Sequence, residues 1–171
     1  DSVWDTLVYK DDVYGLRITS NNLALFYNKE MFANKGLEEP TADWTWDDLR
    51  NAEKTLTDAD NNIYGLDLPV YDKNGGYTWN WLPFLWQNGG EFLNDDRTEA
   101  TFNSPEGVEA LEFWKKMVQE DKSVPLQAAP TGVNRFTSGI TAMVIDGPWN
   151  LSTFLSDPKF KDKFGVAPLP Q

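Results

Sequence analysis

The segment that most constrains the fold is residues 136–150, FTSGITAMVIDGPWN. After the turn signal Ser138-Gly139 comes an apolar run, residues 140–145, which is rich in β-branched residues and short enough to be a buried strand. The run stops at Asp146-Gly147-Pro148 and is followed by Trp149. Open α/β folds present residues to ligands at the carboxyl ends of their strands. Trp149 therefore has two interpretations, a ligand-facing aromatic or a core aromatic beside a turn.

The composition excludes several function classes. The 171 residues include 15 Lys plus Arg and 27 Asp plus Glu, which gives a net charge of −12 and argues against nucleic acid or an anionic membrane surface as a partner. The absence of His and Cys removes Ser-His triads, thiolate nucleophiles and Cys-based zinc sites. We therefore expect no cofactor and no metal. No apolar run is long enough to span a membrane, so this segment should not insert directly.

Further strands and helices follow from local patterns. Apolar runs predict strands at residues 23–27, 63–68 and 164–167. A short helix should start at Asn28 and end at Gly36. Thr45 and Asp48 form a capping-box pattern that predicts a helix over residues 46–56. Ser104-Pro105 predicts the start of another helix, and its inward face is expected to include the apolar residues Val108, Leu111, Met117 and Val118, together with Phe113 or Trp114.

An aromatic-rich segment, residues 77–92, is predicted to be a helix that ends at Asn88-Gly89-Gly90. Its helical spacing places Trp79, Leu82, Phe84 or Leu85, and Trp86 on one face that could be buried. Arg135 lies in a later polar loop; it could reach a ligand cleft, but we expect it to be solvated.

Several ordered phrases resemble one protein family. They are LFYNKEMF, TWDDL, the NGG helix end, FNSPEGVEALEFWKKMV and FTSGITAMVIDGPW. Together they are similar to the extracellular solute-binding proteins of ABC importers, in particular the sugar-binding group that includes maltose-binding protein. The resemblance implies an α/β fold, a periplasmic-binding-protein-like lobe with a central mixed sheet flanked by helices. It also implies that residues 1–171 are the main part of the second lobe, without the first lobe and the last helices. Since the chain begins with Asp1 rather than Met, we expect a mature or excised segment.

The resemblance assigns candidate site residues. In the family, the tryptophan of the GPW motif stacks on a sugar ring between two lobes, which implies that role for Trp149. Alignment on the NGG helix end places Tyr77 and Trp79 at cleft positions, with Trp81 as a possible third. Asn21 and Asn22 precede a strand whose start faces the cleft, so they are candidate donors to ligand hydroxyls; an Asx turn is the alternative. Asp146, at the end of its predicted strand, completes the set.

The resulting hypothesis is non-catalytic binding of an extracellular solute, a mono- or oligosaccharide, for delivery to an ABC transporter permease at an extracytoplasmic location. Maltose-binding proteins have carboxylates where this chain has Asn21 and Tyr77, which leaves the ligand open. One alternative is the same fold with a non-sugar cargo, a glycerophosphate ester or a polyamine. Another is a carbohydrate-active enzyme domain, although the sequence singles out no catalytic pair of carboxylates.

Overall fold

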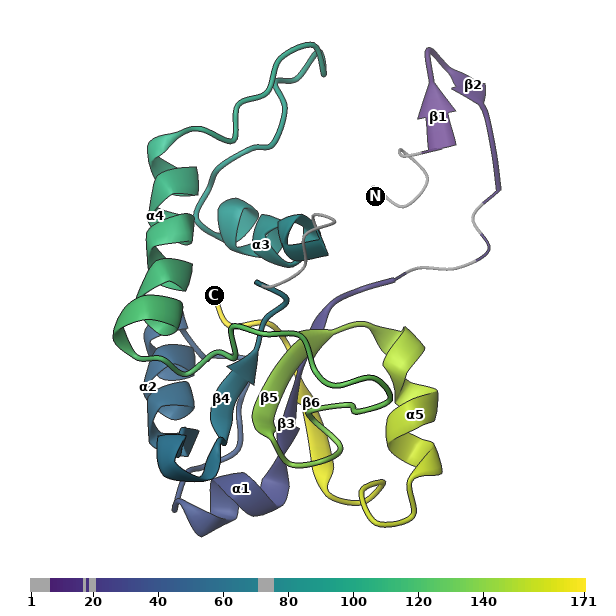
Figure 1. The fold of residues 1–171 in the computed structure, drawn as a ribbon. Helices are drawn as coiled ribbons and strands as arrows, with labels where there is room; N and C mark the ends of the chain where they lie inside the picture. Colours follow the sequence, from purple (N-terminus) through teal and green to yellow (C-terminus); the bar gives the residue numbers. More distant parts are fainter. Residues whose placement is uncertain (1–6, 17, 19–20, 71–75) are drawn as a thin grey trace.

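The computed structural model describes residues 7–16, 18, 21–70 and 76–171, with the side chains of all of these except 76 and 77. Its centre is a four-stranded sheet in the spatial order β4–β5–β3–β6 (Figure 1). The strands are β3 (Ala24–Asn28), β4 (Tyr64–Asp67), β5 (Thr141–Asp146) and β6 (Phe164–Ala167). β4 is parallel to β5, whereas β3 is antiparallel to both β5 and β6. The predicted mixed sheet is therefore confirmed, with strand ends within one residue of those expected.

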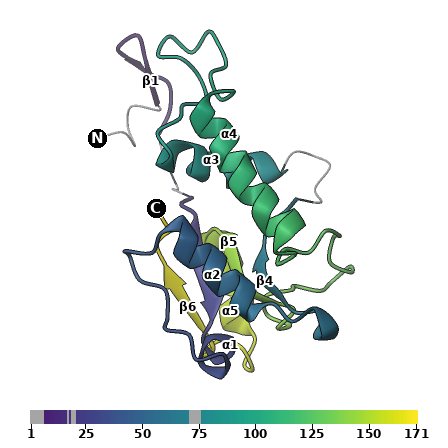
Figure 2. The ribbon, with the colours of Figure 1, turned by 90° about the vertical axis from the view of Figure 1, so that its left-hand side faces the viewer.

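Helices cover both faces of this sheet. α2 (Trp46–Leu56) and α4 (Pro105–Lys115) lie on one side, and α5 (Leu151–Ser156) lies on the other (Figures 1 and 2). Side chains alternate along β3, so Leu25 packs in the larger core with α2 and α4, and Phe26 packs on the opposite face. On that face Phe26 joins a cluster of phenylalanines, Phe136, Phe154 and Phe160. The fold is thus a three-layer α/β arrangement with one core on each face of the sheet.

The remaining elements lie at the ends of the sheet or away from it. α1 (Lys29–Asn34) follows β3 and is capped by Asn28, and α3 (Gly76–Gln87) crosses the end of the sheet where β4 and β5 stop (Figure 1). Short 3₁₀ helices, η2 (Ala59–Asn61) and η4 (Pro148–Asn150), lie in the connections between the larger elements. β1 (Val8–Tyr9) and β2 (Asp12–Val13) form a separate hairpin that extends from the body of the molecule. No helix in the described part of the chain is both long and apolar enough to cross a bilayer.

The start of α2 is determined by local chemistry, as the sequence predicted. The Thr45 hydroxyl accepts a hydrogen bond from the Asp48 backbone N–H, and the Asp48 carboxylate accepts one from the Thr45 backbone N–H. Two backbone donors that the helix would leave unpaired are therefore satisfied. At the other end of the helix, Gly65 of β4 lies against α2 so closely that an added Cβ would be 2.1 Å from the Glu53 carbonyl oxygen. Only glycine allows this approach between helix and strand.

Two predictions of helix faces are wrong in part. In α3 the residues that face the core are Asn80, Trp81, Phe84 and Leu85, while Trp79 and Trp86 are exposed. In α4 Phe113 and Trp114 are buried, and Met117 is buried just beyond its end, as expected, but Ala110 is buried as well, while Val108 and Leu111 are exposed. Both helices carry apolar residues around most of their circumference, so spacing alone does not identify the buried face.

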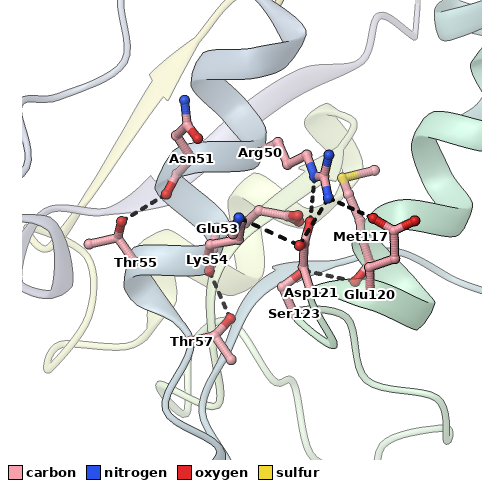
Figure 3. Close-up of polar contacts among 10 residues, drawn as sticks. All are labelled: Arg50, Asn51, Glu53, Lys54, Thr55, Thr57, Met117, Glu120, Asp121 and Ser123. Atoms are coloured by element: carbon pink, nitrogen blue, oxygen red, sulfur yellow. Dashed lines mark hydrogen bonds and ion pairs between the residues drawn. The ribbon is translucent and has the colours of Figure 1, made fainter.

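A layer of polar side chains connects α2 to the helical turn that directly follows α4. There η3 (Lys116–Glu120) is a π-helical turn, and the Asp121 backbone N–H donates to the carbonyl of Lys116. Asp121 then lies beside Arg50 of α2, with 2.5 Å between Arg50 Nε and Asp121 Oδ2, and Arg50 also reaches Glu120 at 3.0 Å (Figure 3). The hydrogen bonds from Arg50 hold the pKa of Asp121 below its usual value. This ion pair ties α2 to the π-helical turn.

Glu53 lies on the inner side of the same layer, and its side chain points toward the Arg50–Asp121 pair (Figure 3). Its side chain is 0% exposed, and neither carboxylate oxygen has a hydrogen-bond partner in the described part of the chain. The neighbouring Ser123 hydroxyl donates to the carbonyl of Met117 instead. Burial raises the pKa of Glu53 from 4.5 to about 8, against the opposing effects of Ser123, Arg50 and Lys54. Near neutral pH this carboxyl group is therefore mostly protonated in the folded protein.

The raised pKa of Glu53 makes the free energy of unfolding depend on pH. Folding favours the protonated carboxyl, so its contribution is complete below pH 4.5 and is lost as the pH rises through about 8. We predict that the Glu53→Gln variant is more stable than the wild type at pH 9, by roughly 2–5 kcal/mol, and gains much less at pH 5.

Guanidinium chloride unfolding at both pH values tests this prediction. The exposed Glu112→Gln substitution on α4 serves as the control and should change stability equally at the two pH values. A Glu53→Gln curve that runs parallel to the wild type across the pH range would contradict the prediction.

Candidate functional site

The candidate site lies at the end of the sheet that α3 crosses. Because β4 and β5 are parallel, their last residues, Asp67 and Asp146, reach the same edge of the sheet. β3 runs the opposite way and pairs Ala24 with Asp146, so the residues before β3 arrive at this edge as well. The topology therefore brings together residues from the chain before β3, the ends of two strands, and the first turns of α3.

Two tryptophans form the aromatic part of the site. The rings of Trp79 in α3 and Trp149 in η4 have centroids 5.4 Å apart with an interplanar angle of 60°. Trp79 is 42% exposed and Trp149 is 44% exposed, so both retain contact with solvent. The Trp149 ring also packs on Gly147, where an added Cβ would lie 2.0 Å from Trp149 Cζ3. Any residue larger than glycine at position 147 would therefore overlap with the indole ring in this position.

Asp146 is held by residues of its own turn. Its Oδ1 accepts a hydrogen bond from the Gly147 backbone N–H at 2.8 Å, and its Oδ2 accepts one from Asn150 Nδ2 at 2.5 Å. Burial raises the pKa of Asp146 above its usual value, and hydrogen bonds from Gly147, Asn150 and the Trp149 side chain act in the opposite direction. The carboxyl group therefore anchors the turn that carries Trp149.

Asp67 is paired with a buried arginine. Arg135 Nη1 lies 3.2 Å from Asp67 Oδ1, and Arg135 Nη2 donates to the carbonyl of Gln127. The expectation of a solvated Arg135 was wrong, because Asp67 provides the counter-charge that lets the guanidinium leave water. Burial raises the pKa of Asp67, the charge of Asp146 raises it further, and Arg135 lowers it. Two carboxyl groups and one guanidinium thus share this end of the sheet.

A pocket of about 210 Å³ opens between these groups. The residues that line it are Asp67, Pro69, Trp79, Asn80, Val144, Ile145 and Asp146. Sequence reasoning did not select Asp67 or Asn80. Asp67 had a signal, since it lies next to the end of a predicted strand, whereas Asn80 had none beyond its place in the aromatic helix.

The other predicted site residues lie elsewhere. Trp81 is buried in the core, with its ring edge-on to Phe102 at 6.4 Å. Asn22 lines a second pocket, of about 280 Å³, on the other side of η4 together with Phe26 and Pro148. Asn21 is exposed and lines neither pocket. Tyr77 belongs to α3, but its side chain lies outside the described residues.

A larger cavity, of about 1020 Å³, lies beside the first residues of β4 and under the loop that follows η3. It contains Tyr64, Lys122 and Arg135 but none of the predicted ligand contacts. Among the described residues, no group of three or more His, Cys, Asp or Glu side chains could hold a metal ion. The tryptophan pair with its pocket combines apolar faces with a few polar groups, which is the combination that sites for organic ligands use.

Comparison with sequence families gives a match over the whole chain. Residues 1–171 match the model of the bacterial extracellular solute-binding proteins. Among curated proteins, a provisionally named binding protein of Brucella abortus is 28% identical over 160 residues, which are 92% of this chain and 38% of that protein. The sn-glycerol-3-phosphate-binding periplasmic protein of Escherichia coli strain K12 is 26% identical over 153 residues, 87% of this chain and 34% of that protein. The chain thus spans little more than a third of these relatives.

Solved structures agree in fold. An ABC substrate-binding protein from Listeria monocytogenes in complex with cycloalternan has a TM-score of 0.81 and 36% identity over 95% of this chain and 40% of its own. An ABC transporter solute-binding protein from Thermotoga lettingae bound with α-D-tagatose has a TM-score of 0.84 and 33% identity over 98% of this chain and 43% of its own. The four-stranded sheet and its helices are therefore an arrangement that these proteins share.

Because the Trp149 ring packs directly on Gly147, a substitution at Gly147 should change the geometry of the tryptophan pair. A Gly147→Ala substitution places a methyl group where the indole ring lies, so the ring should move away from Trp79. We expect the exciton signal of the pair in circular dichroism to fall toward that of the Trp79→Phe variant. The exposed Ser152→Ala substitution in α5 should leave the signal unchanged. A full signal in Gly147→Ala would show that the ring keeps its place.

The Arg135–Asp67 pair generates a prediction about stability. Replacing Arg135 by Met removes the partner of a buried carboxylate, and breaking a buried pair in this way costs about 3–5 kcal/mol. We predict that adding Asp67→Asn to Arg135→Met recovers a large part of this loss, because the second substitution removes the unpaired charge. Urea unfolding of the two single variants and the double variant measures the coupling. Losses that simply add would contradict it.

Proposed function

The chain belongs to the bacterial extracellular solute-binding proteins, and we propose that it forms one lobe of a receptor for a sugar or polyol. The observation that carries the proposal is the half-exposed pair Trp79 and Trp149 beside the pocket at the end of β4 and β5. Indole rings offer flat apolar faces, and the carboxylate and amide oxygens next to them accept hydrogen bonds. A sugar has apolar C–H faces and a rim of hydroxyl groups, which matches both features.

The structures with bound ligand support this choice of cargo. The proteins from Listeria monocytogenes and Thermotoga lettingae, named as complexes with cycloalternan and α-D-tagatose, are 36% and 33% identical to this chain. We propose that Trp149 stacks on a ring of the cargo and that Trp79 forms the adjoining wall. Asn22, with Asn21 beside it, lies on the far side of η4 and would contact a longer ligand that extends past Pro148.

The proposal describes a half-site. The chain covers 40% and 43% of the two structures, and we propose that residues 1–171 are the main part of the second lobe of a two-lobed protein. The opposite wall of the cleft would then come from the first lobe, and closure of the lobes around cargo would present it to the permease of an ABC importer. The corresponding location is extracytoplasmic. No catalysis is proposed, since Asp67 and Asp146 are held by Arg135 and by the turn at Gly147.

A glycerophosphate ester is a second candidate cargo, because the Escherichia coli relative is named for sn-glycerol 3-phosphate. The charges beside the pocket disfavour it, since two carboxyl groups face one guanidinium that is already paired. An anionic phosphate would meet net repulsion unless the other lobe supplied cations. Isothermal titration of the full-length protein with sn-glycerol 3-phosphate and with neutral sugars distinguishes the two candidates.

The proposed stacking predicts the effect of one substitution. Trp149→Ala in the full-length protein should weaken the binding of the preferred sugar by about 1–3 kcal/mol, because it removes a stacking face. Isothermal titration with maltose, lactose, D-tagatose and D-mannitol measures this loss. Trp86→Ala is the matched control, since Trp86 is an exposed tryptophan, 52% accessible, that lines none of the three pockets. Equal dissociation constants for Trp149→Ala and wild type would refute the stacking role.

A further inference from the structure

Asn80 has one half of its amide satisfied and the other half free. It lies in the first turns of α3 and is 2% exposed. Its Nδ2 donates to the backbone carbonyl of Ile145 in β5 at 3.2 Å. Because a carbonyl oxygen can only accept, the amide group must turn its nitrogen toward Ile145. This contact therefore fixes which atom of the amide faces the other way.

The free atom is Oδ1, and it has no hydrogen-bond partner among the described residues. Folded proteins rarely leave a buried amide oxygen unpaired, and such an atom calls for an explanation. The other buried side-chain atoms without partners belong to Glu53, Trp81, Trp114 and Thr141. None of these residues lines the pocket beside the tryptophan pair, whereas Asn80 does. Among the residues that line this pocket, Asn80 is thus the one that carries a buried atom without a partner among the described residues.

The carboxyl groups that line the pocket with Asn80 are hydrogen-bond acceptors, like the free oxygen of Asn80. Asp67 and Asp146 line the same pocket, and both are hydrogen-bond acceptors when ionised. The nearby cation, Arg135, is engaged by Asp67 and by the carbonyl of Gln127. A cargo in this pocket therefore has to supply the donors, and hydroxyl groups do so without bringing charge.

We propose that Asn80 is a specificity-determining residue whose Oδ1 accepts a hydrogen bond from one hydroxyl group of an uncharged, polyhydroxylated cargo. The inference rests on the proposed function and deepens it, because it identifies the residue that reads a hydroxyl group beside the stacking tryptophans. The tether to Ile145 holds the amide in place before the cargo arrives, so little ordering is needed on binding. The anionic group of a charged cargo gains nothing from this oxygen, because a phosphate or carboxylate presents further acceptors.

The experiment compares variants and ligands together in the full-length protein. Isothermal titration first identifies which of maltose, lactose, D-tagatose and D-mannitol binds the wild type, with sn-glycerol 3-phosphate and spermidine as charged probes. The monodeoxy derivatives of the best neutral ligand are then titrated against wild type, Asn80→Leu and Asn80→Asp. Asn51→Leu, at an exposed position of α2, is the matched control.

We expect one deoxy derivative to bind the wild type at least tenfold more weakly than its parent. Asn80→Leu should bind the parent at least tenfold more weakly and lose the preference for parent over that derivative. Asn80→Asp keeps an oxygen at the free position but loses the N–H donor to Ile145, so it should bind the parent more weakly than the wild type while still preferring it over that derivative, and Asn51→Leu should behave as wild type. This pattern separates recognition from structure, since a purely structural role would weaken all derivatives equally.

Three results would overturn the inference alone while sugar binding stands. They are a wild type that discriminates against no deoxy derivative, an Asn80→Leu variant with unchanged affinity, and an equal loss for every derivative. A wild type that binds only sn-glycerol 3-phosphate, only spermidine or none of the probes would overturn the proposed function and this inference together.

Discussion

The parallel pairing of β4 with β5 is the constraint on which the site depends. Parallel neighbours end at the same edge of a sheet, so Asp67 and Asp146 are brought together although 78 positions separate them in the sequence. The connection between the strands contains α3 and α4, and α3 lies across this edge with Trp79 and Asn80 in its first turns. Had β4 paired in the opposite direction, Asp67 would lie at the far end of the sheet. The site therefore follows from strand direction before any side-chain detail.

Much of the fold could be predicted because its local signals agree with its global packing. The run at residues 140–145 is apolar and β-branched, so its strand ended within one residue of the prediction. The capping box at Thr45 and Asp48 determined the start of α2. α3 behaved differently because residues 76–87 contain no charged side chain, and a helix without a polar face gives no indication of its buried side. Trp86 was expected inside for that reason and lies outside.

The candidate site could be predicted only in part, for a related reason. Trp149 and Asp146 follow a strand that the sequence marks clearly, and the structure brings both to the same edge as Trp79. The pairing of Arg135 with Asp67 spans 68 positions, and no local pattern announces it. Asn80 is a polar residue that faces inward, contrary to the usual rule. Buried polar groups owe their placement to partners distant in sequence, so reasoning from spacing alone overlooks them.

The π-helical turn η3 has a consequence for the number of residues that this segment can hold. A π turn holds one residue more than the α-helical turn it replaces, so α4 and η3 together contain an extra residue relative to a regular helix. If the same residues wound as a regular α-helix instead, every following side chain would be rotated by about 100° around the axis. Asp121 would then turn away from Arg50, and Ser123 would leave the edge of β4, where its carbonyl now accepts from Leu66. A one-residue deletion within Lys116–Glu120, by contrast, would remove the extra residue and leave the following side chains facing nearly as they do now.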